Sequence, residues 1–104
     1  MFIKFKLLFT LLCAINLSAI SVIDVRTLEE WNKGHLKNAI HKEWQNILDI
    51  TATVSKDETI YLYCRSGNRS GKATKILTEN GYLNVINAGS IYEASKLLNT
   101  EIIL

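Results

Sequence analysis

The chain has 104 residues, with 12 lysines and arginines against 10 aspartates and glutamates, a net charge of +2, no proline and two cysteines. This length holds one domain. Because Lys4 and Lys6 lie in the N-terminal segment, the remainder is neutral, and it has no basic surface with interleaved aromatic residues, so we set nucleic-acid partners aside.

Residues 1–19, MFIKFKLLFTLLCAINLSA, have the order of a secretory signal peptide: lysines, a short apolar stretch, then small residues. We predict cleavage after Ala19, export to the periplasm, and no stable membrane association of the mature chain. Cleavage after Ser21 would cut into the first strand. The alternatives are an uncleaved membrane anchor, a buried helix, or a lipoprotein cut at Cys13, which the preceding leucine disfavours.

Strands and helices are predicted to alternate after the signal. Apolar and β-branched runs predict the strands Ser21–Val25, Ala39–His41, Thr59–Cys64 and Leu83–Gly89. Helical spacing of apolar residues predicts the helices Leu28–Lys33, Glu43–Thr51, Ser70–Asn80 and Ile91–Asn99. This alternation predicts parallel strands joined by crossover helices, and therefore an α/β fold.

Local signals fix several of these boundaries. Thr27 and Glu30 have the spacing of a capping box at the start of the first helix. Gly34 ends that helix, and Gly81 ends the helix from Ser70 to Asn80. Glu30 is otherwise interpreted as part of a solvated helix face.

The segment YCRSGNRS places Cys64 between Arg65 and Arg69 where a strand ends and a helix begins. In open parallel sheets, ligand sites lie beyond the carboxyl ends of the strands. Cys64 is the only cysteine of the predicted mature chain, and an unpaired thiol in an exported protein indicates a reactive group or an intermolecular bridge. A buried, inert cysteine is the alternative, which these polar neighbours disfavour.

The loop suits an anionic sulfur, since only the thiolate of a cysteine is nucleophilic. The following helix offers unpaired amides, the arginines add charge, and Gly67 and Gly71 let amides turn inward. The loop contains no base for a papain-like hydrolase. His35 and His41 with one cysteine do not form a metal site, and the glycine and lysine spacing does not match a phosphate-binding P-loop.

Two segments resemble the rhodanese domain: VIDVRTLEEWNKGHLKNAI, residues 22–40, and IYLYCRSGNRSGKATKILTENGYLNVINAG, residues 60–89. With the chain's size and signal, they are similar to small periplasmic thiosulfate sulfurtransferases of that family. The resemblance implies a rhodanese-like α/β domain over residues 20–104, with a central, mostly parallel sheet of four to five strands flanked by helices.

The same resemblance implies that Cys64 is the catalytic nucleophile and carries a persulfide. Thiosulfate would donate the sulfur, and cyanide in an assay or a thiol in the cell would accept it, without a metal or cofactor. A six-residue loop matches the sulfurtransferases, whereas related phosphatases and arsenate reductases have one residue more. The implied substrate-binding residues are Arg65, Ser66, Gly67, Asn68, Arg69 and Ser70.

Other features leave alternatives open. A carrier that accepts persulfide without turnover would need the same loop, and a binding module with a dead site is a third class that the intact Cys64 and Arg69 disfavour. The tail GSIYEASKLLNTEIIL lacks the family's usual second glycine and tryptophan. Trp44 is interpreted as a core residue rather than a rim residue, and Asp24 and Arg26 as a structural pair.

Overall fold

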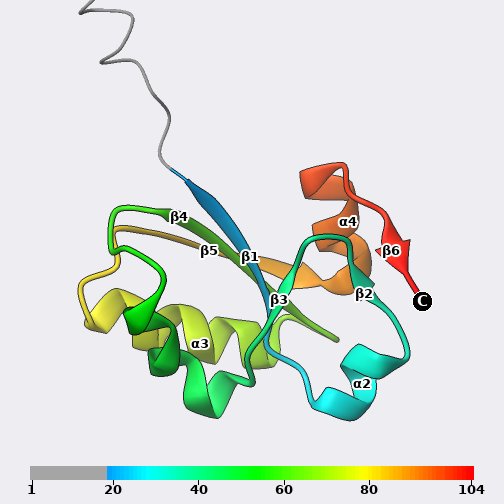
Figure 1. The fold of residues 1–104 in the computed structure, drawn as a ribbon, viewed down its shortest axis with the longest axis horizontal. Helices are drawn as coiled ribbons and strands as arrows, with labels where there is room; N and C mark the ends of the chain where they lie inside the picture. Colours follow the sequence, from blue (N-terminus) through cyan, green and yellow to red (C-terminus); the bar gives the residue numbers. More distant parts are fainter. Residues whose placement is uncertain (1–18) are drawn as a thin grey trace, which may run out of the picture.

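The computed structural model describes residues 19–104. Its strands are β1 (Ile20–Asp24), β2 (His35–Leu36), β3 (Ile40–His41), β4 (Thr59–Cys64), β5 (Asn84–Ser90) and β6 (Ile102–Ile103). Its helices are α2 (Leu28–Asn32), the 3₁₀ helix η1 (Trp44–Ala52), α3 (Asn68–Glu79) and α4 (Ile91–Leu98). The predicted alternation of strands and helices is confirmed (Figure 1).

The central sheet has four strands in the order β3-β1-β4-β5, and every neighbouring pair is parallel. The predicted parallel α/β fold is therefore confirmed. Because β1, β4 and β5 run in the same direction, the helices that follow them all begin at one edge of the sheet. Cys64, the last residue of β4, pairs in register with Ser90 at that edge.

Alternating side chains of β4 enter two separate cores. Ile60, Leu62 and Cys64 belong to a buried cluster that η1 and α3 complete on one face of the sheet. Tyr63 points the other way and packs with residues of α4 in a second cluster. Figure 1 shows α3 and η1 together on one side of the sheet and α4 on the other. A strand that is buried on both faces reads as a nearly continuous apolar run, which explains why TIYLYC predicts a strand so clearly.

Three features differ from the sequence prediction. The segment predicted as a helix from Glu43 to Thr51 is a 3₁₀ helix with non-helical angles at Asn46. The two short strands β2 and β6 form a separate antiparallel pair that the sequence analysis missed. Two-residue strands have no readable alternation, and their pairing joins segments distant in sequence. Helix α3 begins at Asn68, two residues before the predicted start.

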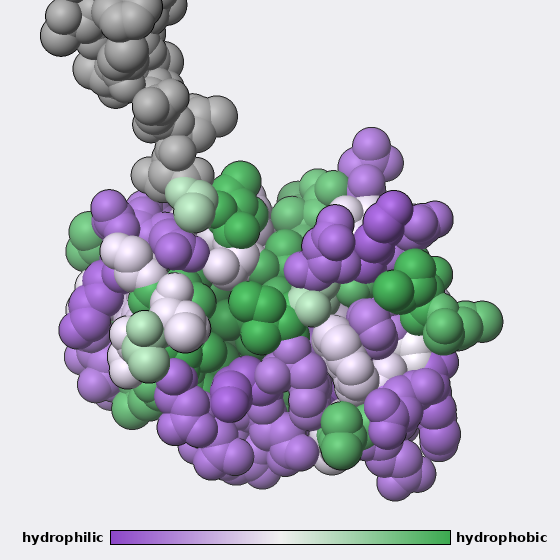
Figure 2. Space-filling model, in the orientation of Figure 1, coloured by the Kyte–Doolittle hydropathy of each residue, from purple (hydrophilic) through white to green (hydrophobic). Residues whose placement is uncertain are grey.

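The predicted signal peptide lies almost wholly outside the described residues. Ser21, the alternative cleavage position, lies inside β1, and the Ala19 carbonyl accepts a hydrogen bond from the Thr59 amide at 3.1 Å. No helix within residues 19–104 is long and apolar enough to cross a membrane. The face in Figure 2 shows hydrophobic residues near its middle and mainly hydrophilic residues along its lower edge.

Candidate active site

The loop after β4 turns directly into α3. Gly67 is the N-cap residue, with φ of 95° in the left-handed region that favours glycine. A β-carbon at this position would lie 3.4 Å from the Gly89 α-carbon. As the N-cap residue, Gly67 has no side chain that could accept a hydrogen bond from the amides of α3. Glycine at position 67 therefore lets the chain turn closely against β5 and leaves amides of this turn without an N-cap side chain.

The free amides converge on the Cys64 sulfur. The Gly67 amide donates to Sγ at 3.0 Å, and the Ser70 amide lies at 3.5 Å from the same atom. The Ser70 hydroxyl is 3.3 Å away. The sulfur therefore occupies the position of a helix cap, and the arrangement stabilises a negative charge there.

Cys64 is fully buried, with 0% of its surface exposed. The expectation that polar neighbours would keep it out of the apolar core is wrong, because the alternation of β4 places it on the same face as Ile60 and Leu62. Its sulfur nevertheless meets amides rather than carbon alone. The residue combines apolar packing on the strand side with hydrogen-bond donors on the loop side.

Burial raises the pKa of the Cys64 thiol, because it disfavours the charged form. Hydrogen bonds to the thiolate outweigh this effect: first that of the Ser70 hydroxyl when its proton is turned toward the sulfur, then those of the amides of Ser70, Ser66 and Gly67. The net pKa of the thiol is lower than its ordinary value. The contribution of the amides fits the nest of donors expected from the sequence.

Arg69 forms an ion pair with Glu30 that closes the loop against α2. The guanidinium donates two hydrogen bonds to the carboxylate, at 2.6 and 2.9 Å. This Arg69 pair, and then hydrogen bonds from Thr27, hold the pKa of Glu30 at about 2, against a smaller opposing effect of burial. The interpretation of Glu30 as a solvated residue is therefore wrong, and much of the Arg69 charge is neutralised.

The remaining loop residues differ in exposure. Arg65, Ser66 and Asn68 are exposed, and the Asn68 amide lies 3.4 Å from the Ser66 hydroxyl. Ser70 is fully buried. The structure thus brings backbone groups of the loop and the Ser70 side chain to the sulfur, while the Arg65 guanidinium faces solvent.

A buried ion pair supports the floor of the site. Asp24, at the end of β1, accepts hydrogen bonds from Arg26 at 2.7 to 3.1 Å, and Arg26 also donates to the Gly34 carbonyl at 2.6 Å. The Arg26 guanidinium lies over the Tyr63 ring at 5.7 Å. The structural pairing of Asp24 and Arg26 expected from the sequence is confirmed.

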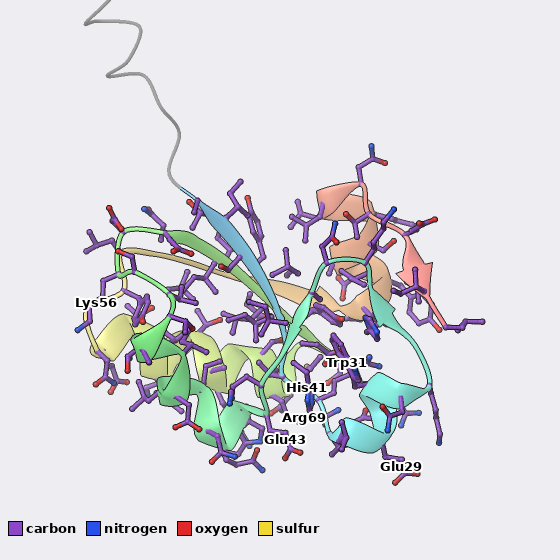
Figure 3. All side chains as sticks on the ribbon, viewed as in Figure 1. Glu29, Trp31, His41, Glu43, Lys56 and Arg69 are labelled. Atoms are coloured by element: carbon purple, nitrogen blue, oxygen red, sulfur yellow. The ribbon has the colours of Figure 1, made fainter. Side chains whose placement is uncertain are left out.

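A cleft of about 300 Å³ opens beside the loop. Its polar wall includes Arg65 and Lys33, and its apolar wall includes Tyr92. Figure 3 shows His41 and Arg69 close to Trp31, and the ring centroids of Trp31 and His41 are 5.3 Å apart. The residues that line the cleft are Arg26, Glu30, Lys33, Arg65, Ile91 and Tyr92.

Aromatic residues flank the site. Trp31 stacks on His35 with ring centroids 3.5 Å apart, and the His35 ring bonds the Leu36 carbonyl. Trp44 is partly buried against the core cluster, and Lys72 lies 4.9 Å from its ring centre. This packing agrees with the core interpretation of Trp44. Within residues 19–104, no group of three potential metal ligands is present.

The sequence analysis missed Asn87 of β5. Its carboxamide bonds the Ser70 hydroxyl at 2.6 Å and the Gly67 carbonyl at 3.0 Å. A polar residue within an otherwise apolar strand segment, Val85–Ala88, was the available signal. Its partners became visible only once the strand order placed β5 beside β4.

The chain is similar to known proteins in both its sequence and its structure. A family model described as the rhodanese-like domain matches residues 11–95. The chain is 38% identical to the thiosulfate sulfurtransferase PspE of Escherichia coli (strain K12) over 71 residues, covering 66% of this chain and 68% of that one. It is 29% identical to the putative sulfur carrier protein YrkF of Bacillus subtilis (strain 168), over 66% of this chain and 37% of that protein.

A solved structure supports the same relationship. A rhodanese with anions from E. coli superimposes with a TM-score of 0.67 at 36% identity, covering 72% of this chain and 91% of the other. The agreement extends from the fold to more than a third of the aligned residues.

Proposed function

The chain belongs to the rhodanese-like domain family of sulfurtransferases, and we propose that it is a thiosulfate sulfurtransferase that works through a persulfide on Cys64. The observation that carries the proposal is the convergence of the Gly67 and Ser70 amides on the Cys64 sulfur. The similarity to PspE supports thiosulfate as the donor.

In the first step, the Cys64 thiolate attacks the outer sulfur of thiosulfate. A bond forms between Cys64 Sγ and that sulfur, the sulfur–sulfur bond of thiosulfate breaks, and sulfite leaves with the electron pair. The product is an anionic persulfide, so the charge moves outward by one atom and total charge is conserved. Amides that donate to the thiolate and the growing anion favour this step.

In the second step, a nucleophile attacks the terminal sulfur of the persulfide. Cyanide yields thiocyanate, and a thiolate yields a new persulfide; in both cases Cys64 leaves as thiolate, ready for another cycle. Neither transfer step needs a general base, because the reacting forms of Cys64, of the persulfide and of the acceptor are all anions.

The cleft beside the loop is the approach that we propose for the donor, because Arg65, the residue after the buried Cys64, lines it. Arg65 and Lys33 line this cleft, and both are cationic. Arg26 and Glu30 line it as well, but each is paired with another side chain. Arg65 is therefore the loop residue best placed to attract a dianion, and Arg69 acts mainly by holding the loop to α2.

Export is part of the same proposal. Residues 1–19 carry the charge and hydropathy order of a signal peptide, which supports export of the mature chain to the periplasm. Mass analysis of the N-terminus in fractionated cells checks this: a mature chain beginning at Ile20 supports export, and an intact Met1 terminus in the cytosol contradicts it.

A persulfide carrier is the second candidate. Complete burial of Cys64 suits a state that retains sulfur, and YrkF, a similar protein, is named a putative sulfur carrier. Steady-state thiocyanate formation separates the two candidates, because repeated turnover supports the enzyme and a single loading supports the carrier.

Intact mass after thiosulfate treatment tests the shared step. The protein should gain the mass of one sulfur atom, and Cys64→Ser should gain none. When both proteins are prepared as full-length chains, Cys13 remains in each as an internal control. A gain that persists in Cys64→Ser, or no gain in the wild type, would contradict the proposed nucleophile.

A further inference from the structure

Backbone partners fix the orientation of the Asn87 side chain. Its Oδ1 accepts a hydrogen bond from the Gly89 amide at 3.0 Å, and its Nδ2 donates to the Gly67 carbonyl at 3.0 Å. A flipped carboxamide would place a donor against the Gly89 donor and an acceptor against the Gly67 acceptor. Since both partners are main-chain groups, the assignment of oxygen and nitrogen is unambiguous.

This orientation determines where the Ser70 hydroxyl proton lies. Asn87 Oδ1 can only accept, so at 2.6 Å the Ser70 hydroxyl must be the donor. A hydroxyl has one proton. The Ser70 oxygen therefore presents a lone pair to the Cys64 sulfur, 3.3 Å away, and the Cys64 thiol is the donor in that contact.

Ionisation of Cys64 changes this arrangement. A thiolate has no proton to donate, and the Ser70 lone pair then faces a negative charge. The hydroxyl can stabilise the thiolate only by rotating toward it, which removes the Ser70 proton from Asn87. Cys64 and Asn87 thus compete for one proton, and the competition favours the neutral thiol.

We infer that Asn87 is a positioning residue that restrains the ionisation of Cys64 by holding the Ser70 hydroxyl as an acceptor toward the sulfur. Asn87 does not contact the reacting atoms in this role. It limits the fraction of thiolate, while the Gly67 and Ser70 amides promote it. The inference concerns the protonation of the thiol, so its main readout is independent of sulfur transfer.

Other charged groups around Cys64 have partners of their own. From α3, Arg69 pairs with Glu30 of α2, and its pKa is raised first by that carboxylate and to a smaller extent by Cys64. From β1 and the residues after it, Asp24 pairs with Arg26. Arg65 faces solvent. Tyr63 of β4 accepts from the Leu36 amide, and burial raises its pKa. A substitution at Asn87 leaves all of these pairs in place.

The test is a pH titration of thiolate absorbance near 240 nm in the full chain, with the spectrum of the Cys64→Ser protein subtracted. Subtraction removes the contributions of Cys13 and the tyrosines. In Asn87→Ala, the pKa of Cys64 should fall by about half to one unit, the equivalent of one ordinary hydrogen bond. A purely structural role, in which Asn87 only anchors the loop through Gly67, predicts the opposite sign, because a loosened Gly67 amide donates less well. A rise or no change overturns the inference.

Two further variants make the result specific. In a Ser70→Ala background, Asn87→Ala should produce no fall, because the contested proton is gone; a persistent fall would contradict the inference. Asn84→Ala, on the same strand, is the matched control and should leave the titration unchanged. If Asn87→Ala does not fold, Asn87→Ser gives a second measurement: its shorter side chain stays near Gly89 but withdraws from Ser70, and the same fall is expected.

The activity profile provides a second readout. With thiosulfate and cyanide, the acid limb of kcat/KM should move to lower pH in Asn87→Ala by the same amount as the titration. If no variant shows turnover, the proposed enzyme fails, while the absorbance titration still decides the role of Asn87.

Discussion

The junctions that follow β4 and β5 lie at the same edge of the sheet and treat their helix amides in opposite ways. Each contains a glycine in the left-handed region, Gly67 at φ of 95° and Gly89 at 83°. After β5, Ser90 and Glu93 form a capping box at the start of α4, and we call this the closed junction. After β4, the N-cap residue Gly67 has no side chain, and the loop amides donate to the Cys64 sulfur instead. We call this the open junction.

Helix α2 resembles α4 in this respect, since Thr27 and Glu30 form its capping box. Among the three α-helices of residues 19–104, α3 alone has no side-chain cap. A capping box uses the helix's first amides internally, so its absence leaves donors for an anion. The comparison teaches that Cys64, the proposed nucleophile, lies where the usual rule for starting a helix is not followed.

Substitution of Gly67 breaks the open junction most strongly. In Gly67→Val, a branched side chain would have to adopt φ of 95° and press against Gly89, so the loop must move and its amides lose their direction. We expect a loss of about 100-fold in the rate of sulfur loading, similar to the removal of one donor from an oxyanion hole. Stopped-flow measurement of sulfite release reports this rate.

Gly81→Val is the matched control for that experiment. Gly81 has φ of 91° at the far end of α3, where only the Lys56 side chain lies nearby. Both substitutions should lower the free energy of unfolding by about 1 to 2 kcal/mol through left-handed strain. Only Gly67→Val should lose activity, and equal rates in the two variants would contradict the special role of the open junction.

Glu30 and Glu93 occupy the same position in two capping boxes, but only Glu30 also binds a residue of the open junction. Glu30→Gln should reduce the free energy of unfolding by about 1 to 2 kcal/mol, less than its full pKa shift implies, because both partners are a quarter exposed. Glu93→Gln should reduce the free energy of unfolding by a smaller amount, because Glu93 has a role only in its capping box. Urea denaturation at neutral pH measures both values.

The pH dependence of the Glu30 effect has a definite sign. Its pKa of about 2 in the folded protein is below the ordinary value of 4.5, so the stabilisation is complete above pH 4.5 and is lost as the pH falls toward 2. The difference between wild type and Glu30→Gln should shrink over that range. A constant difference would show that the ion pair with Arg69 contributes little.

Ser90→Ala tests the closed junction directly. It removes the hydroxyl that caps α4 at 3.1 Å from the Glu93 amide, and such changes cost about 1 kcal/mol of stability. Because this amide does not reach the sulfur, the absorbance titration of Cys64 should be unchanged. A shifted titration would mean that the two junctions are not independent.

Much of the fold could be read from the sequence because its signals are local. The apolar run of β4, the capping box at Thr27 and the stop at Gly81 each depend on a few adjacent residues. The pairing of β2 with β6 could not be read, because it joins residues more than 60 positions apart over two-residue strands. The turn at Asn46 inside η1 likewise depends on tertiary packing.

The candidate site divides in the same way. The position of Cys64 and the glycine of its loop were local signals, and the structure places both as the sequence indicated. The roles of Glu30 and Asn87 depend on contacts with loop residues 39 and 17 to 20 positions away, which no local pattern encodes. The burial of Cys64 was also missed. The polar residues that follow it suggested an exposed position, whereas strand alternation places it on the same buried face as Ile60 and Leu62.

The smallest expected effect is the pH dependence that the open junction gives to stability. The pKa of Cys64 in the folded protein is below its ordinary value of 9.0, so folding favours the thiolate. That stabilisation is fully present above about pH 9 and is lost as the pH falls through the lower, folded value. Cys64→Ser retains an acceptor for the Gly67 amide but does not ionise. The difference in unfolding free energy between wild type and Cys64→Ser should therefore grow as the pH rises toward 9 and then level off, by the same amount in a Ser90→Ala background. A difference that stays flat would show that the amides of α3 stabilise the thiol and the thiolate equally, and the contrast between the two junctions would then have no chemical consequence.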